Sequence, residues 1–248
     1  MVNTANKASG AKVDNAESRV PKHIAIVMDG NRRFSKRLMM KPWKGHEWGA
    51  KKVEQVLEWC EELGVKELTL YAFSVENFNR PKEEFDYLMG LFEREFNRIK
   101  DDPKIMKKGL RIHFIGRLWM FPKKVQESMK ALAEKTKFND RTQVNFAIAY
   151  GGRAEVIDAV KKIASKVASG EMGVEEVNES SFSKNLYFEG EPELIIRTGG
   201  DMRTSNFLMW QANYSEWYFC EKLWPEFEKK DFVLAVEDYK ERERRFGR

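Results

Sequence analysis

The amino-acid sequence predicts an α/β protein with a single domain, built on a mostly parallel six-stranded sheet flanked by helices. Strand-like and helix-like segments alternate from about residue 22 to the C-terminus, with no linker between halves. This alternation is typical of parallel sheets. Four of the strand-like segments also end in polar clusters rich in glycine or arginine. Because ligands bind outside the carboxyl ends of strands in open α/β sheets, these clusters predict one shared site.

Hydrophobic periodicity places the expected elements along the chain. Strands are expected at 23–28, 66–73, 109–115, 143–149, 193–197 and near 217–220. Helices are expected after the first strand, over 45–63, from 81, over 122–137 and 154–168, near 182–186 and from about 230. Residues 1–20 are small and polar without apolar periodicity, which predicts a disordered tail before a domain over 21–248.

The bulk composition limits the classes of partner. The chain has 248 residues, a hydrophobic fraction of 42% and a formal net charge of +5. Such a mild charge fits a solvated basic surface, attraction to an anionic substrate or attraction to a membrane surface. No nucleic-acid partner is expected, because the basic residues are interleaved with Glu and form no dedicated tail. No apolar run approaches the ~18 residues of a membrane span, so we expect a soluble or peripheral protein.

The two cysteines, Cys60 and Cys220, are expected to be buried thiols rather than a disulfide. Cys60 shares a helix stripe with apolar residues, and Cys220 ends an aromatic strand. With no signal peptide expected, this use of cysteine predicts a reducing compartment, the cytoplasm.

The first polar cluster follows the strand that ends at Met28. Asp29 in this position can hold Mg²⁺ against a diphosphate, because Mg²⁺ uses one or two carboxylates together with phosphate oxygens. It can equally serve as a helix N-cap. Arg33 and His46 stand at the starts of successive helices and can face the same anion.

Two later clusters also carry arginine. Ser74, Asn77 and Arg80 place a hydroxyl, an amide and a guanidinium in one loop, although loop and cap chemistry around the next proline explains them too. Arg197 and Arg203 surround a glycine pair, with a serine two residues further on, which predicts an oxyanion grip.

Some chemistries have no support in the sequence. The three histidines lack metal-ligand spacing and the two cysteines are far apart, so a zinc site is not expected. No G-x-x-x-x-G-K-[ST] motif occurs, which excludes a P-loop enzyme.

Glu216 precedes the last strand and is either a second metal carboxylate or a solvent-facing residue of an edge strand.

Taken together, the clusters closely resemble the motifs of the cis-prenyltransferases, whose type member is undecaprenyl diphosphate synthase. The resemblance covers about residues 22–248. Its motifs are Met28-Asp29-Gly30-Asn31, Gly45-His46, Ser74-x-Glu76-Asn77-x-x-Arg80-Pro81, Tyr150-Gly151-Gly152-Arg153 and Arg197-Thr-Gly-Gly-x-x-Arg203-x-Ser205-Asn206-Phe207-x-x-Trp210-Gln211.

The resemblance implies an enzyme that condenses isopentenyl diphosphate with an allylic diphosphate in a Mg²⁺-dependent reaction and makes new cis double bonds. The product expected is a polyprenyl diphosphate, a precursor of glycosyl-carrier lipid. The family is dimeric, so a homodimer or a heterodimer with a related subunit is expected. A supporting subunit with little activity of its own is the alternative, although such subunits are expected to lose the carboxylate at Asp29 or the paired arginines.

The resemblance also assigns roles to individual residues. Those that match the allylic diphosphate loop are Gly30, Asn31, Arg33, His46 and Arg80. Those that match the isopentenyl diphosphate grip are Arg197, Arg203 and Ser205. The matching Mg²⁺ ligands are Asp29 and Glu216, and Ser74 and Asn77 match residues that position isopentenyl diphosphate and assist proton removal. Near the C-terminus, Arg245-Phe246-Gly247 matches a motif that reaches into the neighbouring subunit's site.

An apolar tunnel is required for the hydrocarbon tails. Its expected lining is Phe85, Leu88, Met89, Phe92, Phe146 and Ile148, although plain core packing explains the same stripe. The sequence departs from the family pattern at Arg32, Phe34, Pro42, Phe78 and Arg117. Arg32 adds positive charge beside the allylic loop and is included among the substrate-binding residues. These departures leave open the allylic donor, the product length and the regiochemistry of joining.

Overall fold

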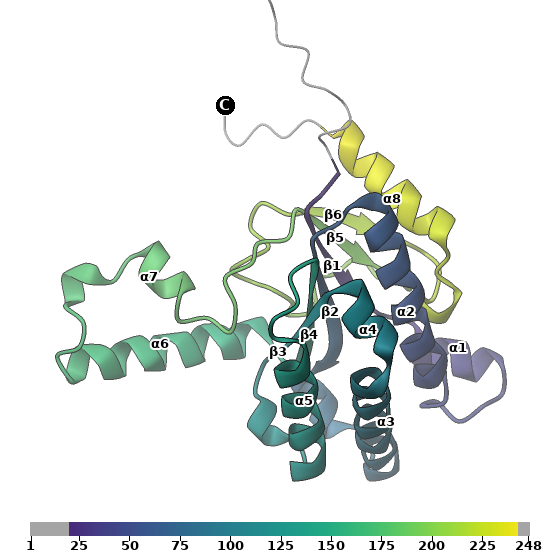
Figure 1. The fold of residues 1–248 in the computed structure, drawn as a ribbon, viewed down its shortest axis with the longest axis horizontal. Helices are drawn as coiled ribbons and strands as arrows, with labels where there is room; N and C mark the ends of the chain where they lie inside the picture. The colour runs from purple at the N-terminus through teal and green to yellow at the C-terminus, as the bar shows by residue number, and fades with distance from the viewer. Residues whose placement is uncertain (1–19, 243–248) are drawn as a thin grey trace, which may run out of the picture.

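The computed structural model describes residues 20–242, which form one α/β unit (Figure 1). All six strands are parallel, in the order β3-β4-β2-β1-β5-β6. The strands are β1 (His23–Val27), β2 (Glu67–Ser74), β3 (Leu110–Ile115), β4 (Thr142–Tyr150), β5 (Leu194–Arg197) and β6 (Glu216–Phe219). The predicted parallel six-stranded sheet is confirmed. The tail predicted for residues 1–20 falls outside the described residues except at its last position.

Helices connect the strands at nearly the predicted places. They are α1 (Asn31–Arg37), α2 (Gly45–Leu63), α3 (Lys82–Asp101), α4 (Pro103–Lys108), α5 (Lys123–Thr136), α6 (Gly152–Ala168), α7 (Glu179–Ser183) and α8 (Lys229–Glu241). The sequence analysis missed α4, although its start carries a clear signal. Asp102 caps the helix by accepting the Lys104 N–H at 2.8 Å, and Pro103 occupies the first helical position.

The two faces of the sheet are covered differently. Buried side chains of α2, α3, α5 and α8 pack on one face and form the larger core. The opposite face has a smaller core, in which Tyr150 and Phe207 pack with side chains of the segment 187–217. The helix α6 projects away from the sheet together with α7, to the left in Figure 1. Both faces of the sheet are covered, as expected, but this face is covered mainly by irregular chain.

A bulge in β2 shapes the edge where the site lies. The pairing of β2 with β4 shifts register between Tyr71 and Phe73 and again before Ser74. As a result Ala72 and Phe73 both face the larger core. Tyr71 instead faces the smaller core, where its ring stacks on that of Phe207 with 4.5 Å between the ring centroids. Bulges re-aim side chains in this way near active sites. This one brings Ser74 to the wall of the main cavity.

The two cysteines, Cys60 and Cys220, are buried free thiols, as the sequence predicts. Between residues 20 and 242, no helix combines the length and the apolar character that a crossing of the bilayer requires.

Candidate active site

An ion pair between Asp29 and Arg197 stands at the centre of the site. The neighbouring strands β1 and β5 pair Val27 with Arg197, and Asp29 follows two residues later. One guanidinium nitrogen of Arg197 donates to Asp29 Oδ2 at 2.8 Å, and another donates to Ser205 Oγ at 2.7 Å. The Arg197 side chain is only 3% exposed. A charge so deeply buried needs an ionised partner, so strand register and charge pairing together fix this pair.

Asp29 is ionised at neutral pH. Burial alone raises the pKa of a carboxyl group, but the hydrogen bond and charge of Arg197 and the charge of Arg33 outweigh it, and the pKa of Asp29 falls below its ordinary value. Its backbone carbonyl accepts bonds from Thr198 Oγ1 at 2.8 Å and from the Trp224 N–H at 2.9 Å. The carboxylate is thus held rigidly at the edge of the sheet.

A second layer of charges surrounds this pair. Arg33 lies 3.3 Å from Asp29 Oδ1, donates to the Gly199 carbonyl at 2.7 Å and donates to Asp201 Oδ2 at 3.1 Å. Arg203 donates to the same Asp201 oxygen at 2.9 Å. Gly199 has φ of +91°, and a Cβ there would lie 2.5 Å from the Arg33 guanidinium, so glycine is required for this contact.

The loop that opens α1 also depends on glycine. Gly30 has φ of +111°, in the left-handed region, and a Cβ at this position would lie 2.9 Å from Leu223. Asn31 follows, is buried and donates to the Met28 carbonyl at 3.1 Å. Its Oδ1 has no hydrogen-bond partner among the described residues, which leaves a buried acceptor at the wall of the cavity.

Arg80 and His46 form a third group, on the α2 and α3 side. Arg80 donates to Glu84, one helical turn away, at 2.7 Å, and Glu84 is 1% exposed. Burial, with the charges of Arg80 and Arg32, lowers the pKa of His46 to about 3. His46 is therefore neutral, and its Nε2 lies 3.3 Å from Arg80 Nη1, a donor. The second ring nitrogen then carries the proton and can donate.

Ser74 and Asn77 lie in the turn between β2 and α3, a 3-10 helix over Val75–Asn79. Asn77 Oδ1 accepts the Ser74 N–H at 3.1 Å and closes a capping box. Asn206 donates to Glu76 Oε1 at 3.0 Å and so ties this turn to the arginine loop. Ser205 and Asn206 have positive φ values of 50° and 62°, a strain that tends to occur at functional sites.

A cavity of about 630 Å³ starts at these groups. Its polar end is lined by Asp29, Asn31, His46, Ser74, Asn77, Arg80, Arg197 and Ser205. Its middle is lined by Leu57, Leu88, Leu91, Phe92, Phe96 and Phe146, and charged side chains, among them Glu58, Arg98 and Lys108, line the part away from Asp29. Leu110, at the first residue of β3, also lines it. Asp29 lies past the C-terminal end of β1, and Leu110 lies at the N-terminal start of β3. The cavity therefore extends roughly 20 Å along the strands.

The predicted tunnel lining was right in part. Leu88, Phe92 and Phe146 line the cavity. Met89 and Ile148 are instead buried in the larger core, and Phe85 packs beside it in contact with the Phe73 and Phe78 rings. These three were assigned from helical and strand periodicity, which gives the buried face but does not distinguish solid core from cavity wall.

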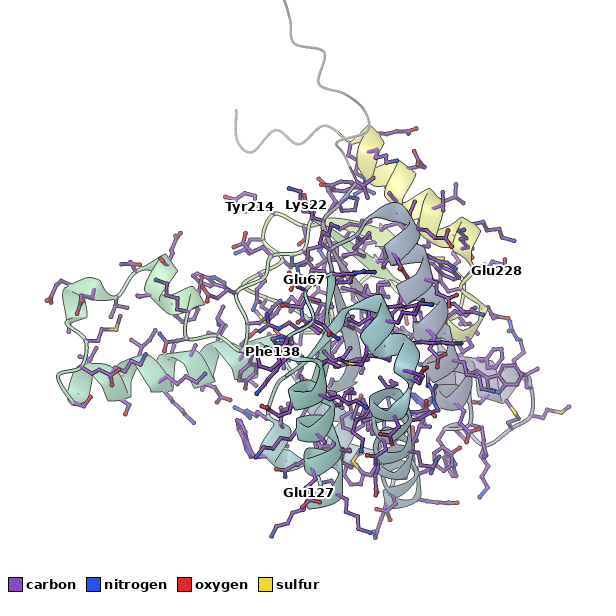
Figure 2. The ribbon with its side chains drawn as sticks, viewed as in Figure 1. Lys22, Glu67, Glu127, Phe138, Tyr214 and Glu228 are labelled. Carbon is purple, nitrogen blue, oxygen red and sulfur yellow. The ribbon has the colours of Figure 1, made fainter. Side chains whose placement is uncertain are left out.

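The structure does not bring Glu216 to Asp29 within one chain. Glu216 pairs with Leu194 at the start of β5, and Arg197 lies three residues further on, level with Val27. Lys22 and Glu67, labelled in Figure 2, mark this same N-terminal edge of the sheet. Glu216 pairs there with Arg242 at 2.8 Å. Glu216 was assigned to the metal from the resemblance alone, and the register of β6 places it at the opposite edge of the sheet within this chain.

The remaining predicted residues are placed as follows. Arg32 lies 3.7 Å from Glu84, with a half-exposed side chain beside the allylic loop residues. Arg245 and Gly247 lie outside the described residues. Sequence reasoning missed Glu84 and Asp201, which neutralise the arginines. The i,i+4 spacing of Arg80 and Glu84 is a signal that was available.

The donor set fits a divalent cation that a substrate brings with it. Among residues 20–242, no group of three or more His, Cys, Asp or Glu side chains can hold a metal ion. Asp29 offers one ionised carboxylate at the wall of the cavity. Mg²⁺ characteristically binds one or two carboxylates together with phosphate oxygens and waters. A diphosphate at the neighbouring guanidinium groups would complete such a ligand set.

Comparison with known proteins agrees with this geometry. The family described as "Putative undecaprenyl diphosphate synthase" matches residues 27–247. A tritrans,polycis-undecaprenyl-diphosphate synthase (geranylgeranyl-diphosphate specific) of Methanocaldococcus jannaschii is 50% identical over 236 residues, which are 94% of this chain and 84% of the relative. An isoprenyl transferase of Thermus thermophilus is 43% identical over 235 residues, 92% of this chain and 89% of the relative.

A solved structure shows the same fold. Lavandulyl diphosphate synthase from Lavandula x intermedia, in complex with dimethylallyl diphosphate, superposes with a TM-score of 0.86 and 32% identity, covering 92% of this chain and 99% of that chain. The chain therefore belongs to the undecaprenyl diphosphate synthase family of cis-prenyltransferases. It is a prenyl-group transferase that makes a polyprenyl diphosphate.

Proposed function

We propose that this enzyme extends an allylic diphosphate with isopentenyl diphosphate in a Mg²⁺-dependent reaction and makes new cis double bonds. One observation carries the proposal. Arg33 and Arg197 contact Asp29, and Arg80 lines the polar end of the same cavity, whose middle is apolar. Guanidinium groups match phosphate oxygens, and the apolar middle suits an isoprenoid tail.

The arrangement of donors supports two adjacent diphosphate subsites. On one side Arg33, Arg80 and His46 offer donors to the allylic diphosphate, together with the loop at Gly30 and Asn31. On the other side Arg197 and Ser205, with Arg203 beyond them, offer donors to isopentenyl diphosphate. The Asp29 carboxylate lies between the two groups, in contact with Arg33 and Arg197.

Electrostatics then promote departure of the allylic diphosphate. Negative charge develops on the leaving diphosphate as its bond to carbon breaks, and preorganised donors stabilise such charge best in a water-excluded site. Mg²⁺ held by Asp29 and the phosphates would neutralise further charge on the leaving group. The apolar middle between α2 and α3 keeps water from the allylic cation while the acceptor's double bond attacks it.

The turn with Ser74 and Asn77 suits the final step. After the new carbon–carbon bond forms, a proton leaves the isopentenyl unit. Both residues line the cavity, and the hydrogen bond from the Ser74 N–H to Asn77 fixes their relative positions. We assign them to positioning isopentenyl diphosphate and assisting this proton transfer.

Geranylgeranyl diphosphate is our proposed primer, and the product is a precursor of glycosyl-carrier lipid. The 50%-identical relative from Methanocaldococcus jannaschii is named as specific for geranylgeranyl diphosphate and as an undecaprenyl diphosphate synthase. A cavity that reaches from Asp29 to Leu110 is consistent with a long tail.

A homodimer is our proposed assembly. The helix α6 projects from the sheet and exposes Ile157 and Val160 to 50% and 48%, on one stripe of the helix (Figure 1). Such a projecting apolar stripe suits burial against a second copy.

The proposal is tested by incubating the full chain with labelled isopentenyl diphosphate, Mg²⁺ and allylic diphosphates of increasing length. We expect label in polyprenyl products, with geranylgeranyl diphosphate as the best primer. Absence of labelled extended product with every primer would overturn the reaction, and a clear preference for a shorter primer would overturn the primer assignment.

A further inference from the structure

Positive charge is concentrated in the segment that forms α1, the following loop and the first half of α2. Residues 31–52 contain eight Lys or Arg and one acidic residue, Glu47, whereas the entire 248-residue chain has a formal charge of only +5. The diphosphate site accounts for Arg32 and Arg33. It does not account for the lysines further along the segment.

Large apolar side chains are exposed in the same segment. Met39 is 95% exposed, Trp48 is 53% exposed and Leu38 is 48% exposed. Phe34 connects two of these residues. Its ring lies 5.8 Å from that of Trp48, and Leu38 follows it by one helical turn, with the Leu38 N–H bonded to the Phe34 carbonyl at 3.2 Å. Met39 is the next residue in the chain, so the three exposures lie in one region of the chain.

Lysines frame this apolar area. Lys44 and Lys51 are exposed on α2 and lie four residues before and three residues after Trp48, so all three share one helix face. Lys36 is exposed near the end of α1. Lys44 pairs with Glu47 at 3.3 Å, but exposed pairs of this kind hold a charge only weakly. We call Lys36, Leu38, Met39, Lys44, Trp48 and Lys51 the basic-apolar patch.

The composition of the patch favours a lipid surface over a protein partner. Lysine is depleted from the centres of protein–protein interfaces. Trp beside lysines is instead the pattern of interfacial membrane contact, in which the ring enters the headgroup layer and the ammonium groups meet anionic lipids. Each lysine near such a surface strengthens binding, and this contribution falls as salt rises.

We propose that the basic-apolar patch docks the enzyme on the surface of an anionic lipid bilayer. The patch lies beside the proposed active site. Met39 borders a second cavity, of about 690 Å³, whose walls also include Asp29, Arg33 and Arg203. Docking therefore places the polar mouth of the active site at the bilayer surface, where long isoprenoid diphosphates partition. Binding itself does not rest on the proposed function, so it is measured without turnover.

The test is sedimentation of the full chain with vesicles of phosphatidylcholine alone or phosphatidylcholine mixed with phosphatidylglycerol. We expect binding to the anionic vesicles that weakens with salt. The double variants Leu38→Glu/Trp48→Glu and Lys44→Ala/Lys51→Ala should each bind about tenfold more weakly. The lysine variant touches no packed side chain of the core, so it remains informative if the other fails to fold.

The matched control is Trp119→Glu/Phe138→Glu, which replaces side chains 64% and 89% exposed elsewhere on the molecule. Phe138, labelled near the middle of Figure 2, lies just past the end of α5, whereas α1 lies at the right of Figure 1. The control should bind like the unmodified chain. Equal binding to neutral and anionic vesicles, or patch variants that bind as well as the control, would overturn the proposal. A changed oligomeric state with unchanged vesicle binding would overturn it in favour of a second copy of the chain.

Discussion

Asp29 and Glu155 both follow a parallel strand, Asp29 in the loop after β1 and Glu155 in the first turn of α6 after β4, yet their pKa values move in opposite directions. Asp29 follows β1, where the arginines outweigh burial and the pKa falls. Glu155 follows β4 and is 1% exposed, and burial raises its pKa because the groups that bond to it are neutral. Those groups are the Tyr150 hydroxyl, the Gln211 amide and the Tyr187 N–H.

The difference separates the carboxylate that we propose acts in the reaction from a structural one. The carboxyl group of Glu155 accepts hydrogen bonds from the three neutral donors and so links α6 to the chain before β6. Glu155 lines neither of the two cavities. Asp29 keeps 29% of its side chain exposed and lines both cavities. Asp29 and Glu155 are both at least partly buried and both hydrogen-bonded. What distinguishes Asp29 is the positive charge around it and its contact with the cavities.

The largest expected effect comes from Asp29→Asn. This variant keeps the shape of the side chain and removes the charge that faces Arg197 and the diphosphates. We expect kcat to fall at least about 10³-fold, because the carboxylate that would hold Mg²⁺ against the leaving diphosphate is lost. Steady-state assays with saturating substrates and Mg²⁺ measure the effect. A variant that retains full turnover would remove Asp29 from the mechanism.

Glu155→Ala should affect stability and spare the chemistry. It leaves the Tyr150 hydroxyl and the Gln211 amide without their buried acceptor, which we expect to cost about 2–3 kcal/mol of unfolding free energy. Denaturant unfolding measures this cost, and turnover per folded molecule should stay within about threefold of the unmodified enzyme. A loss of turnover comparable with that of Asp29→Asn would break the distinction between the two carboxylates.

The middle of the cavity should control product length and not rate. Leu57 is a partly buried residue of α2 that lines the cavity, and Leu57→Trp fills part of the space for the growing tail. We expect products shorter by one or more isoprene units, measured by chromatography of the hydrolysed chains. Leu63→Trp, at the end of the same helix and away from the cavity wall, is the matched control. Identical product lengths in both variants would place the tail elsewhere.

The smallest effects are in the pH dependence of stability, where the two carboxylates should show opposite signs. The pKa of Asp29 lies below its ordinary 3.8 in the folded protein, so its stabilisation is complete above that value and is lost as pH falls through the folded pKa. The pKa of Glu155 lies above its ordinary 4.5, so its stabilisation is present below that value and is lost as pH rises through the folded pKa.

On acidification, the stability advantage of the unmodified chain over Asp29→Asn should therefore shrink. Its stability relative to Glu155→Gln should rise. Unfolding free energies measured across acidic and neutral pH for the three proteins check both slopes, and slopes of the same sign would contradict the assignment of charge at these positions.

The sequence predicted most of the sheet and part of the site because both depend on local pattern. Parallel strands bring their carboxyl ends to one edge, so Asp29 and Arg197 meet as soon as β1 and β5 pair in register. Residues whose position depends on distant packing were harder to place. Glu216 stands at the other end of its strand, and the bulge at Ala72 exists only in the pairing with β4.

The projecting helix α6 illustrates the same limit. Its 3.6-residue periodicity predicted a helix over 154–168, which is confirmed with two earlier residues. Periodicity alone does not say which partner covers the apolar stripe, and here the stripe is left exposed at Ile157 and Val160. Leu88 lines the cavity whereas its neighbour Met89 is buried in the core. This difference depends on how the helices pack together, which the sequence of one helix does not determine.

The most direct test of the central claim is a crystal structure with Mg²⁺, isopentenyl diphosphate and an unreactive thio analogue of geranylgeranyl diphosphate. We predict both diphosphates side by side, one at Arg197 and Ser205 and the other at Arg33 and Arg80, with the hydrocarbon tail between α2 and α3. Diphosphates bound away from these guanidinium groups, or a tail lying outside the cavity, would contradict the account.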